Sequence, residues 1–179
     1  MTKERSEILI GGIGGQGVVY SANLIARSAL RQYKFASSIA HYGPESRGSV
    51  TTSEVVISNP VSDGPDYPVV ERPDVFIALH QKAYDEYLAG HKTSPEYLIY
   101  DSTLVTVGSG RDGLVGVPAS QLAKEKLSNI MMANIILTAV FAKTTGLVPR
   151  DDLEQALKEI MPARDFTLGQ KALEIGFGM

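Results

Sequence analysis

Two short loops hold most of the residues that are suited to ligand binding or chemistry. The first lies in I-L-I-G-G-I-G-G-Q-G-V-V-Y, where Gly12, Gly14 and Gly17 have the G-x-G-x-x-G spacing. The second, H-Y-G-P-E-S-R-G-S, runs from His41 to Ser49. The first loop offers backbone N–H groups with little side-chain cover, and the second offers side chains that donate, accept or titrate.

The glycine loop lies between a short apolar run and a helical pattern. A unit of strand, glycines and helix directs backbone N–H groups and the positive end of the helix dipole at one point, which favours phosphate binding. The alternative is a tight turn that lets strand and helix pack closely without a ligand. The amide of Gln16, inside the loop, is equally suited to a ligand and to the loop's own backbone.

An NAD site lacks support because the dinucleotide fingerprint requires an acidic residue about 20 positions further on. No Asp or Glu occurs from Ile8 to Pro44, and the charged residues there are Arg27, Arg31 and Lys34. Arg31 or Lys34 would suit the 2′-phosphate of NADP. A solvated helix face is the favoured interpretation for each.

The second loop is dense in reactive side chains. Arg47 presents a planar fork for a carboxylate or phosphate, Glu45 is placed to pair with it, and Tyr42 can stack or donate. The alternative is that Glu45 and Arg47 form a structural ion pair, and for His41 the favoured interpretation is a strand-end histidine. Because loops at the carboxyl ends of strands share one edge of an open α/β sheet, we expect this loop beside the glycine loop.

Strands alternating with helices position these loops and predict an α/β fold, a single three-layer Rossmann-like domain over residues 1–179. The strand at 50–58 follows its predecessor too closely for a crossover helix, so that pair is predicted antiparallel and the sheet mixed but mostly parallel. Residues 59–73 are predicted to be a surface loop or flap. Strands are expected at 8–10, 37–41, 50–58, 74–79, 97–101 and 114–117, and helices at 18–33, 82–88, from 118, and at 130–143, 151–160 and 166–175.

Composition narrows the possible functions. The chain has 179 residues, a formal net charge of -3 and no cysteine. The charge gives no general attraction to nucleic acid or to an anionic membrane. The absence of cysteine excludes disulfides, cysteine-ligated clusters and a cysteine nucleophile, and is consistent with the cytoplasm. No metal site and no membrane span are expected.

The two loops together resemble the gamma subunit, or gamma domain, of 2-oxoacid:ferredoxin oxidoreductases, the family of pyruvate, ketoisovalerate and 2-oxoglutarate oxidoreductases. G-G-Q-G and Y-G-P-E-S-R-G are much rarer together than alone. The likeness continues through P-D-V-F-I-A-L-H-Q-K-A and N-I-I-L-T-A-V-F-A-K-T-T-G-L, to about Ala172. The chain departs from the usual pattern at Ser49, His80 and Thr138.

The resemblance implies an accessory subunit, expected to be inactive alone, of an enzyme that oxidatively decarboxylates a 2-oxoacid to its acyl-CoA. It implies that alpha and beta subunits carry thiamine diphosphate, that iron–sulfur clusters lie on partner chains such as a ferredoxin-like delta subunit, and that ferredoxin accepts the electrons. This chain is expected to help bind coenzyme A and to support assembly.

The resemblance also implies roles for particular residues. Gly12, Gly14, Gly15, Gln16 and Gly17 would form the phosphate loop. Tyr42, Glu45 and Arg47 would form the neighbouring loop at the subunit interface, and Asn134 would reach the same cleft or only fix its own helix. The alternatives are the small subunit of indolepyruvate oxidoreductase, a free-standing NADP-dependent reductase and a non-catalytic nucleotide-binding sensor. No residue is expected to be catalytic.

Overall fold

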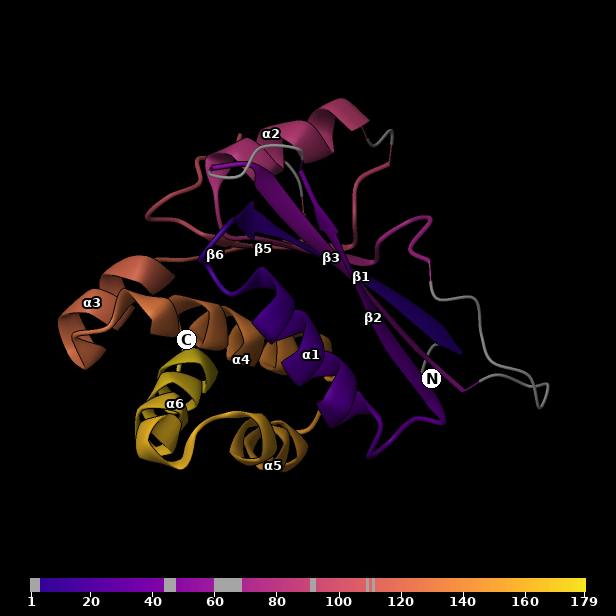
Figure 1. Cartoon of the computed structure of the whole chain (residues 1–179). Coiled ribbons are helices and arrows are strands. Elements are labelled where there is room, and N and C mark those ends of the chain that lie inside the picture. The colour runs from indigo at the N-terminus through magenta and orange to yellow at the C-terminus, as the bar shows by residue number, and fades with distance from the viewer. Residues whose placement is uncertain (1–3, 44–47, 60–68, 91–92, 109, 111) are drawn as a thin grey trace.

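The computed structural model describes residues 4–43, 48–59, 69–90, 93–108, 110 and 112–179. Within these residues six strands form one sheet in the order β2-β3-β1-β4-β5-β6 (Figure 1). The strands are β1 (Arg5–Ile13), β2 (Phe35–Tyr42), β3 (Val50–Ser58), β4 (Val75–Ala78), β5 (Tyr97–Asp101) and β6 (Leu114–Val117).

The sheet is mixed, as predicted. Strands β1, β4, β5 and β6 are parallel, and β3 is antiparallel to both β1 and β2. Strand β3 therefore lies between β2 and β1, an arrangement that local sequence patterns did not predict. The carboxyl ends of β1 and β2 still lie at the same edge of the sheet, because two antiparallel pairings restore the direction.

Strand β1 is longer than the predicted 8–10. Its ladder with β3 continues through Gly12, opposite Thr51, to Ile13, opposite Val50. Two residues of the glycine motif, Gly11 and Gly12, are therefore part of the strand. Pairing with β3 supplies backbone hydrogen bonds that compensate for the low strand propensity of glycine.

The helices form layers on the two faces of the sheet (Figure 1). Helix α2 (Gln81–Gly90) covers one face, where Tyr84 and Tyr87 pack with Phe76 of β4. Helices α1 (Val18–Ala29) and α4 (Ala133–Thr145) pack against the other face, and α5 and α6 lie beneath them. The remaining helical elements are α3 (Ala119–Leu127), the 3-10 turn η1 (Ile130–Met132), α5 (Arg150–Ile160) and α6 (Ala163–Phe177).

Helix α4 is the central buried helix that its apolar sequence predicted. Every residue from 133 to 142 is buried, so the helix has no polar face toward solvent. Full burial of a Leu or Ile side chain contributes about 1.5–3 kcal/mol relative to exposure, which makes α4 a large part of the core. The chain enters it through η1 rather than as one helix from residue 130.

Helix α1 ends at Ala29 rather than at residue 33. The carbonyl of Ala29 accepts bonds from the N–H groups of Gln32 and Tyr33, which closes a turn in place of a further helical turn. No helix in the described part of the chain is long and apolar enough to cross a lipid bilayer.

Candidate functional site

The glycine loop is a tight turn from β1 into α1. The N–H of Gln16 donates to the carbonyl of Ile13 at 3.2 Å, and the carbonyl of Gly17 accepts the first helical bond, from Ser21, at 2.9 Å. Gly15 and Gly17 have φ values of 93° and 77°, which side-chain-bearing residues adopt only with strain. Within the described residues, the N–H groups of Gly14 and Gly15 donate to no other protein atom.

Gln16 binds the protein backbone with both ends of its amide. Its Oε1 accepts the N–H of Ile13 at 2.9 Å, and its Nε2 donates to the carbonyl of Leu79 at 3.0 Å. The first bond closes the glycine loop, and the second ties it to the carboxyl end of β4. Of the two roles open to Gln16, the geometry supports the structural one.

The glycines of the loop divide into two kinds. A Cβ on Gly12 would lie 2.8 Å from Val18 Cγ2, and a Cβ on Gly17 would lie 1.7 Å from Asn134 Nδ2. Those two glycines permit close packing. A Cβ on Gly14 or Gly15 would meet nothing within 4 Å, so these two glycines face open space. The turn interpretation therefore explains Gly12 and Gly17 by close packing and Gly15 by its φ of 93°, but it does not explain Gly14.

Asn134, at the start of α4, contacts the glycine loop through its side chain. Its side-chain Nδ2 donates to the carbonyl of Gly17 at 3.3 Å, and only 5% of the residue is exposed. Its backbone carbonyl accepts the hydroxyl of Thr138 at 2.8 Å. Asn134 thus contacts the glycine loop directly, which fits a role in positioning the loop.

Tyr42 lies beside the glycine loop, as the shared sheet edge predicted. It pairs with Thr51 of β3, which in turn pairs with Gly12. Tyr42 is 71% exposed, so its ring stands at the rim of the site. A cavity of about 310 Å³ lies beside the glycine loop, and its lining includes Gly14, Gly15, Gly17, Tyr20, Tyr42, Thr51 and Met131.

A smaller cavity of about 90 Å³ lies on the other side of the loop. Its wall includes Gly15 and Asp101, the last residue of β5. The carboxylate of Asp101 accepts the N–H and hydroxyl of Ser120 at 3.0 and 2.5 Å and the N–H of Thr103 at 3.1 Å. Asp101 therefore anchors the start of α3, which leaves it with a structural role.

The edge also has the geometry of a topological switch point. Strands β1 and β4 are adjacent and parallel, yet α1 leaves β1 toward one face and α2 leaves β4 toward the other (Figure 1). Such a divergence opens a crevice outside the carboxyl ends of the two strands, where ligands of open α/β sheets bind. The bond from Gln16 to Leu79 joins the two strand ends at this crevice.

The ring of side chains around the glycine loop is apolar. Tyr42, Leu104, Ile130 and Met131 are exposed by 71%, 37%, 54% and 47%, and each lines one of the two cavities beside the loop. Contiguous exposed apolar groups on a folded chain mark surfaces that contact another molecule.

Burial raises the pKa of the Tyr20 phenol, whose hydroxyl has no partner among the described residues.

Glu45 and Arg47 lie outside the described residues, so their proposed pairing stays a prediction. At the base of their loop, the N–H of Gly43 donates to the carbonyl of Val50 at 3.0 Å. His41 Nε2 lies 3.3 Å from Glu54 Oε1 of the neighbouring strand. This placement agrees with a strand-end histidine.

Arg31 and Lys34, which follow the end of α1, do not face the site. Arg31 pairs with Glu159 of α5, at the end of α1 remote from the glycine loop. Lys34 precedes β2 and so lies at the opposite edge of the sheet. Neither is placed to bind the 2′-phosphate of a nucleotide that sits on the glycine loop.

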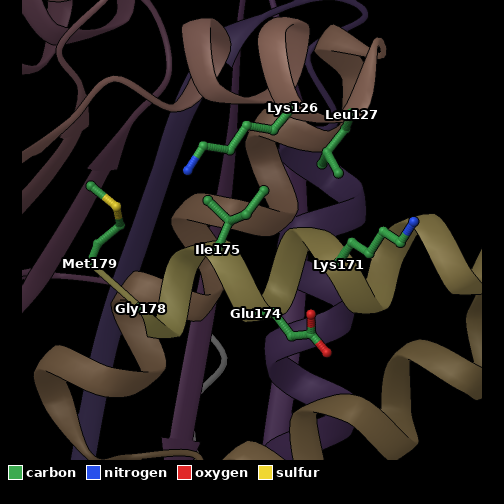
Figure 2. A pocket seen from close by; sticks show the side chains of 7 residues that line it. All are labelled: Lys126, Leu127, Lys171, Glu174, Ile175, Gly178 and Met179. Atoms are coloured by element: carbon green, nitrogen blue, oxygen red, sulfur yellow. The ribbon is translucent and has the colours of Figure 1, made fainter.

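A larger cavity of about 530 Å³ lies between α3 and α6, away from this edge. Figure 2 shows that the charged ends of Lys126, Lys171 and Glu174 point in different directions and do not converge on one place. A ligand site needs a few converging polar groups, so this cavity is not the candidate. In the described part of the chain no group of His, Cys, Asp and Glu is arranged to hold a metal ion.

Sequence reasoning missed several residues that line the site. Thr51 follows from the register of the antiparallel pair, since it lies opposite Tyr42. Met131 is an apolar residue just before the buried helix, and its N–H is held by Asn129 Oδ1 at 3.0 Å. The exposed Ile130 and Met131 were assigned to the buried helix, although the Asn129 cap marked a separate turn.

The fold defines an α/β chain of the Rossmann-like class, with a glycine loop at the carboxyl edge of its mostly parallel sheet. The chain belongs to the pyruvate ferredoxin/flavodoxin oxidoreductase family, whose profile matches residues 7–178. Its relatives in that family are gamma subunits of 2-oxoacid:ferredoxin oxidoreductases, as the sequence resemblance predicted.

Similar proteins support this assignment. The chain is 33% identical over 165 residues to the 2-oxoglutarate synthase subunit KorC of Methanocaldococcus jannaschii, with 89% of this chain and 86% of that protein covered. The gamma subunit of a keto/oxoacid ferredoxin oxidoreductase from Geobacter sulfurreducens has a TM-score of 0.81 at 30% identity, with coverage of 97% and 96%.

A third match concerns the fold alone. A 2-oxoglutarate:ferredoxin oxidoreductase from Magnetococcus marinus, solved with 2-oxoglutarate, coenzyme A and succinyl-CoA bound, has a TM-score of 0.82 at 19% identity. The match covers 98% of this chain and 31% of that one. The same fold therefore occurs there as part of a longer chain.

Proposed function

We propose that this gamma subunit binds part of coenzyme A at its glycine-loop edge and is inactive as an isolated chain. The observation that carries the proposal is the pair Gly14 and Gly15, whose N–H groups have no acceptor among the described residues and whose Cα atoms face open space. Both glycines are exposed, so an incoming anion can reach these donors and replace solvent as their acceptor.

The site fits a phosphate group of coenzyme A. Backbone N–H groups at the start of a helix, without an acidic residue in its first turn, attract an anion. The adjoining cavity of about 310 Å³ suits one portion of a ligand as long as coenzyme A rather than the whole molecule. The coenzyme A bound in the Magnetococcus marinus enzyme is consistent with this choice of ligand.

The apolar rim suggests what completes the site. Tyr42, Leu104, Ile130 and Met131 surround the glycine loop and are exposed in the single chain. We propose that a partner subunit of the same enzyme covers this rim, so that coenzyme A lies between the two chains. Glu45 and Arg47, which belong to the loop after Tyr42, would join that interface.

The chemistry of the reaction belongs to the partners in this proposal. Thiamine diphosphate on the alpha and beta subunits would supply the carbanion chemistry, and iron–sulfur clusters on partner chains, including a ferredoxin-like delta subunit, would pass electrons to ferredoxin. This chain has no cysteine with which to ligate a cluster. Its own residues would bind and orient coenzyme A and exclude water at the interface, in a cytoplasmic complex.

Titration of coenzyme A into the complex of this chain with its partner subunits tests the proposal. Replacement of Gly14 by Asp places a negative charge at the open donors, and we expect coenzyme A affinity to fall about tenfold or more. Gly14→Ala is the matched control, since its Cβ meets nothing within 4 Å, and should bind within about twofold of the wild type. Equal affinity of all three proteins would refute the proposal.

A further inference from the structure

Lys82 lies in the first turn of α2, the helix that follows β4. Its side-chain Nζ donates to the carbonyl of Gly48 at 3.3 Å. Gly48 lies two residues before β3, so this contact joins the start of α2 to the segment that leads into β3. The preceding residues are already engaged: His80 Nδ1 accepts the N–H of Lys82, and Gln81 bonds to Thr106 and Asp85.

The positive charge of Lys82 is not neutralised within the described part of the chain. Its ammonium contacts a neutral carbonyl, and no described carboxylate forms an ion pair with it. The first turn of a helix is also an unfavourable place for a cation, because the helix dipole is positive there. The stability of α2 therefore does not explain this lysine.

The position of Lys82 relative to the glycine loop explains it better. Helices α1 and α2 follow the adjacent parallel strands β1 and β4 and lie on opposite faces of the sheet (Figure 1). Gln16 bonds to Leu79, and a Cβ on Gly11 would lie 3.1 Å from Ala83 Cβ, so the start of α2 packs directly on the end of β1. Lys82 therefore lies at the same edge of the sheet as the glycine loop, on the face that α2 covers.

We propose that Lys82 pairs with a phosphate group of the ligand that occupies the switch-point crevice. The inference rests on the proposed function, in which that ligand is coenzyme A. The glycine loop and Lys82 then hold one ligand from two sides, with N–H groups on the α1 side and a full positive charge on the α2 side. The phosphate in question is the diphosphate or the 3′-phosphate of coenzyme A.

Affinities of coenzyme A and dephospho-coenzyme A, measured with the assembled complex at low salt, test the inference. We expect Lys82→Gln to weaken coenzyme A binding about three- to fivefold and to reduce its salt dependence, while Lys82→Arg restores both. Lys158→Gln, an exposed lysine of α5, is the matched control and should leave binding unchanged. Melting temperatures of the variants establish that the complex is intact.

The two ligands identify the phosphate. A loss with coenzyme A alone assigns Lys82 to the 3′-phosphate, and an equal loss with both ligands assigns it to the diphosphate. Wild-type affinity and salt dependence in Lys82→Gln, together with weak binding by Gly14→Asp, would overturn the inference and leave the proposed function standing. Wild-type binding by both variants would overturn the two together.

Discussion

The two ends of β1 differ in how many of their polar groups are hydrogen-bonded within the chain. At the start of the strand, Glu7 Oε2 accepts the N–H groups of Glu71 and Arg72, both at 2.8 Å, and the N–H of Glu7 donates to Asp74 Oδ2 at 2.9 Å. Arg5 donates to the carbonyl of Val69 at 2.8 Å. At this end of the strand, charged side chains of the chain itself bond to the neighbouring backbone groups.

At the other end of the strand, Gly14 and Gly15 keep open donors and an apolar rim surrounds them. At one end of the strand the protein therefore bonds its own polar groups, and at the other end two backbone donors have no acceptor among the described residues. This difference teaches that a glycine motif is informative through the groups it leaves unsatisfied, rather than through its spacing. Four substitutions sharpen the comparison.

The largest effect is expected for Gly17→Ala. Its Cβ would lie 1.7 Å from Asn134 Nδ2, on a residue whose φ is 77°. We expect the free energy of unfolding to fall by about 2 kcal/mol or more. Chemical denaturation measures the change, and Gly14→Ala should lose less than about 0.5 kcal/mol. Equal stability of the two variants would contradict the division of the glycines.

A smaller loss is expected for Gln16→Met, which keeps the side-chain length and removes both amide bonds. The N–H of Ile13 and the carbonyl of Leu79 then lose their partner. We expect a loss of about 1–2 kcal/mol by denaturation, since part-buried backbone groups are left without a hydrogen bond. A variant as stable as the wild type would show that Gln16 is free to bind a ligand.

At the closed end, Glu7→Gln should destabilise the chain by about 1 kcal/mol, because the bonds from Glu71 and Arg72 lose their charged acceptor. Coenzyme A affinity of the complex should not change. Glu71→Gln, on an exposed side chain nearby, serves as the control for altered surface charge. A drop in coenzyme A affinity in Glu7→Gln alone would show that the two ends of β1 are not independent.

The smallest effect is a pH dependence that comes from Tyr20 in the cavity wall. Burial raises the pKa of this phenol above 10.0, so the unfolded chain releases the proton first as the pH rises. The stability contribution is complete below about pH 10 and is lost as the pH rises through the folded-state pKa. Denaturation curves between about pH 9 and 11 should show a shallower loss for Tyr20→Phe than for the wild type. Identical slopes would exclude Tyr20 as a source of the loss.

Local sequence patterns predicted the strands, most helices and the approach of the two loops. They could not predict that β3 lies between β2 and β1, because strand order depends on contacts far apart in the chain. The length of β1 was also not predictable from local patterns, because Gly11 and Gly12 extend the strand only through pairing with β3.

The site was predicted less completely than the fold. Spacing identified Gly12, Gly14 and Gly17, and the resemblance added Gly15, but neither separated Gly14 and Gly15 from Gly12 and Gly17, whose role is packing. Nor did it decide the two roles of Gln16, because the carbonyl of Leu79 belongs to a strand end 63 residues away. No role was predicted for Lys82, because nothing in the sequence shows that α2 begins beside Gly48.

The most direct test of the central claim is a structure of the assembled complex with coenzyme A bound, determined by electron cryo-microscopy. We expect a phosphate oxygen of coenzyme A about 3 Å from the backbone nitrogens of Gly14 and Gly15, with a partner subunit over Tyr42 and Met131. Coenzyme A bound elsewhere, with those nitrogens covered by a partner's side chains, would contradict the account.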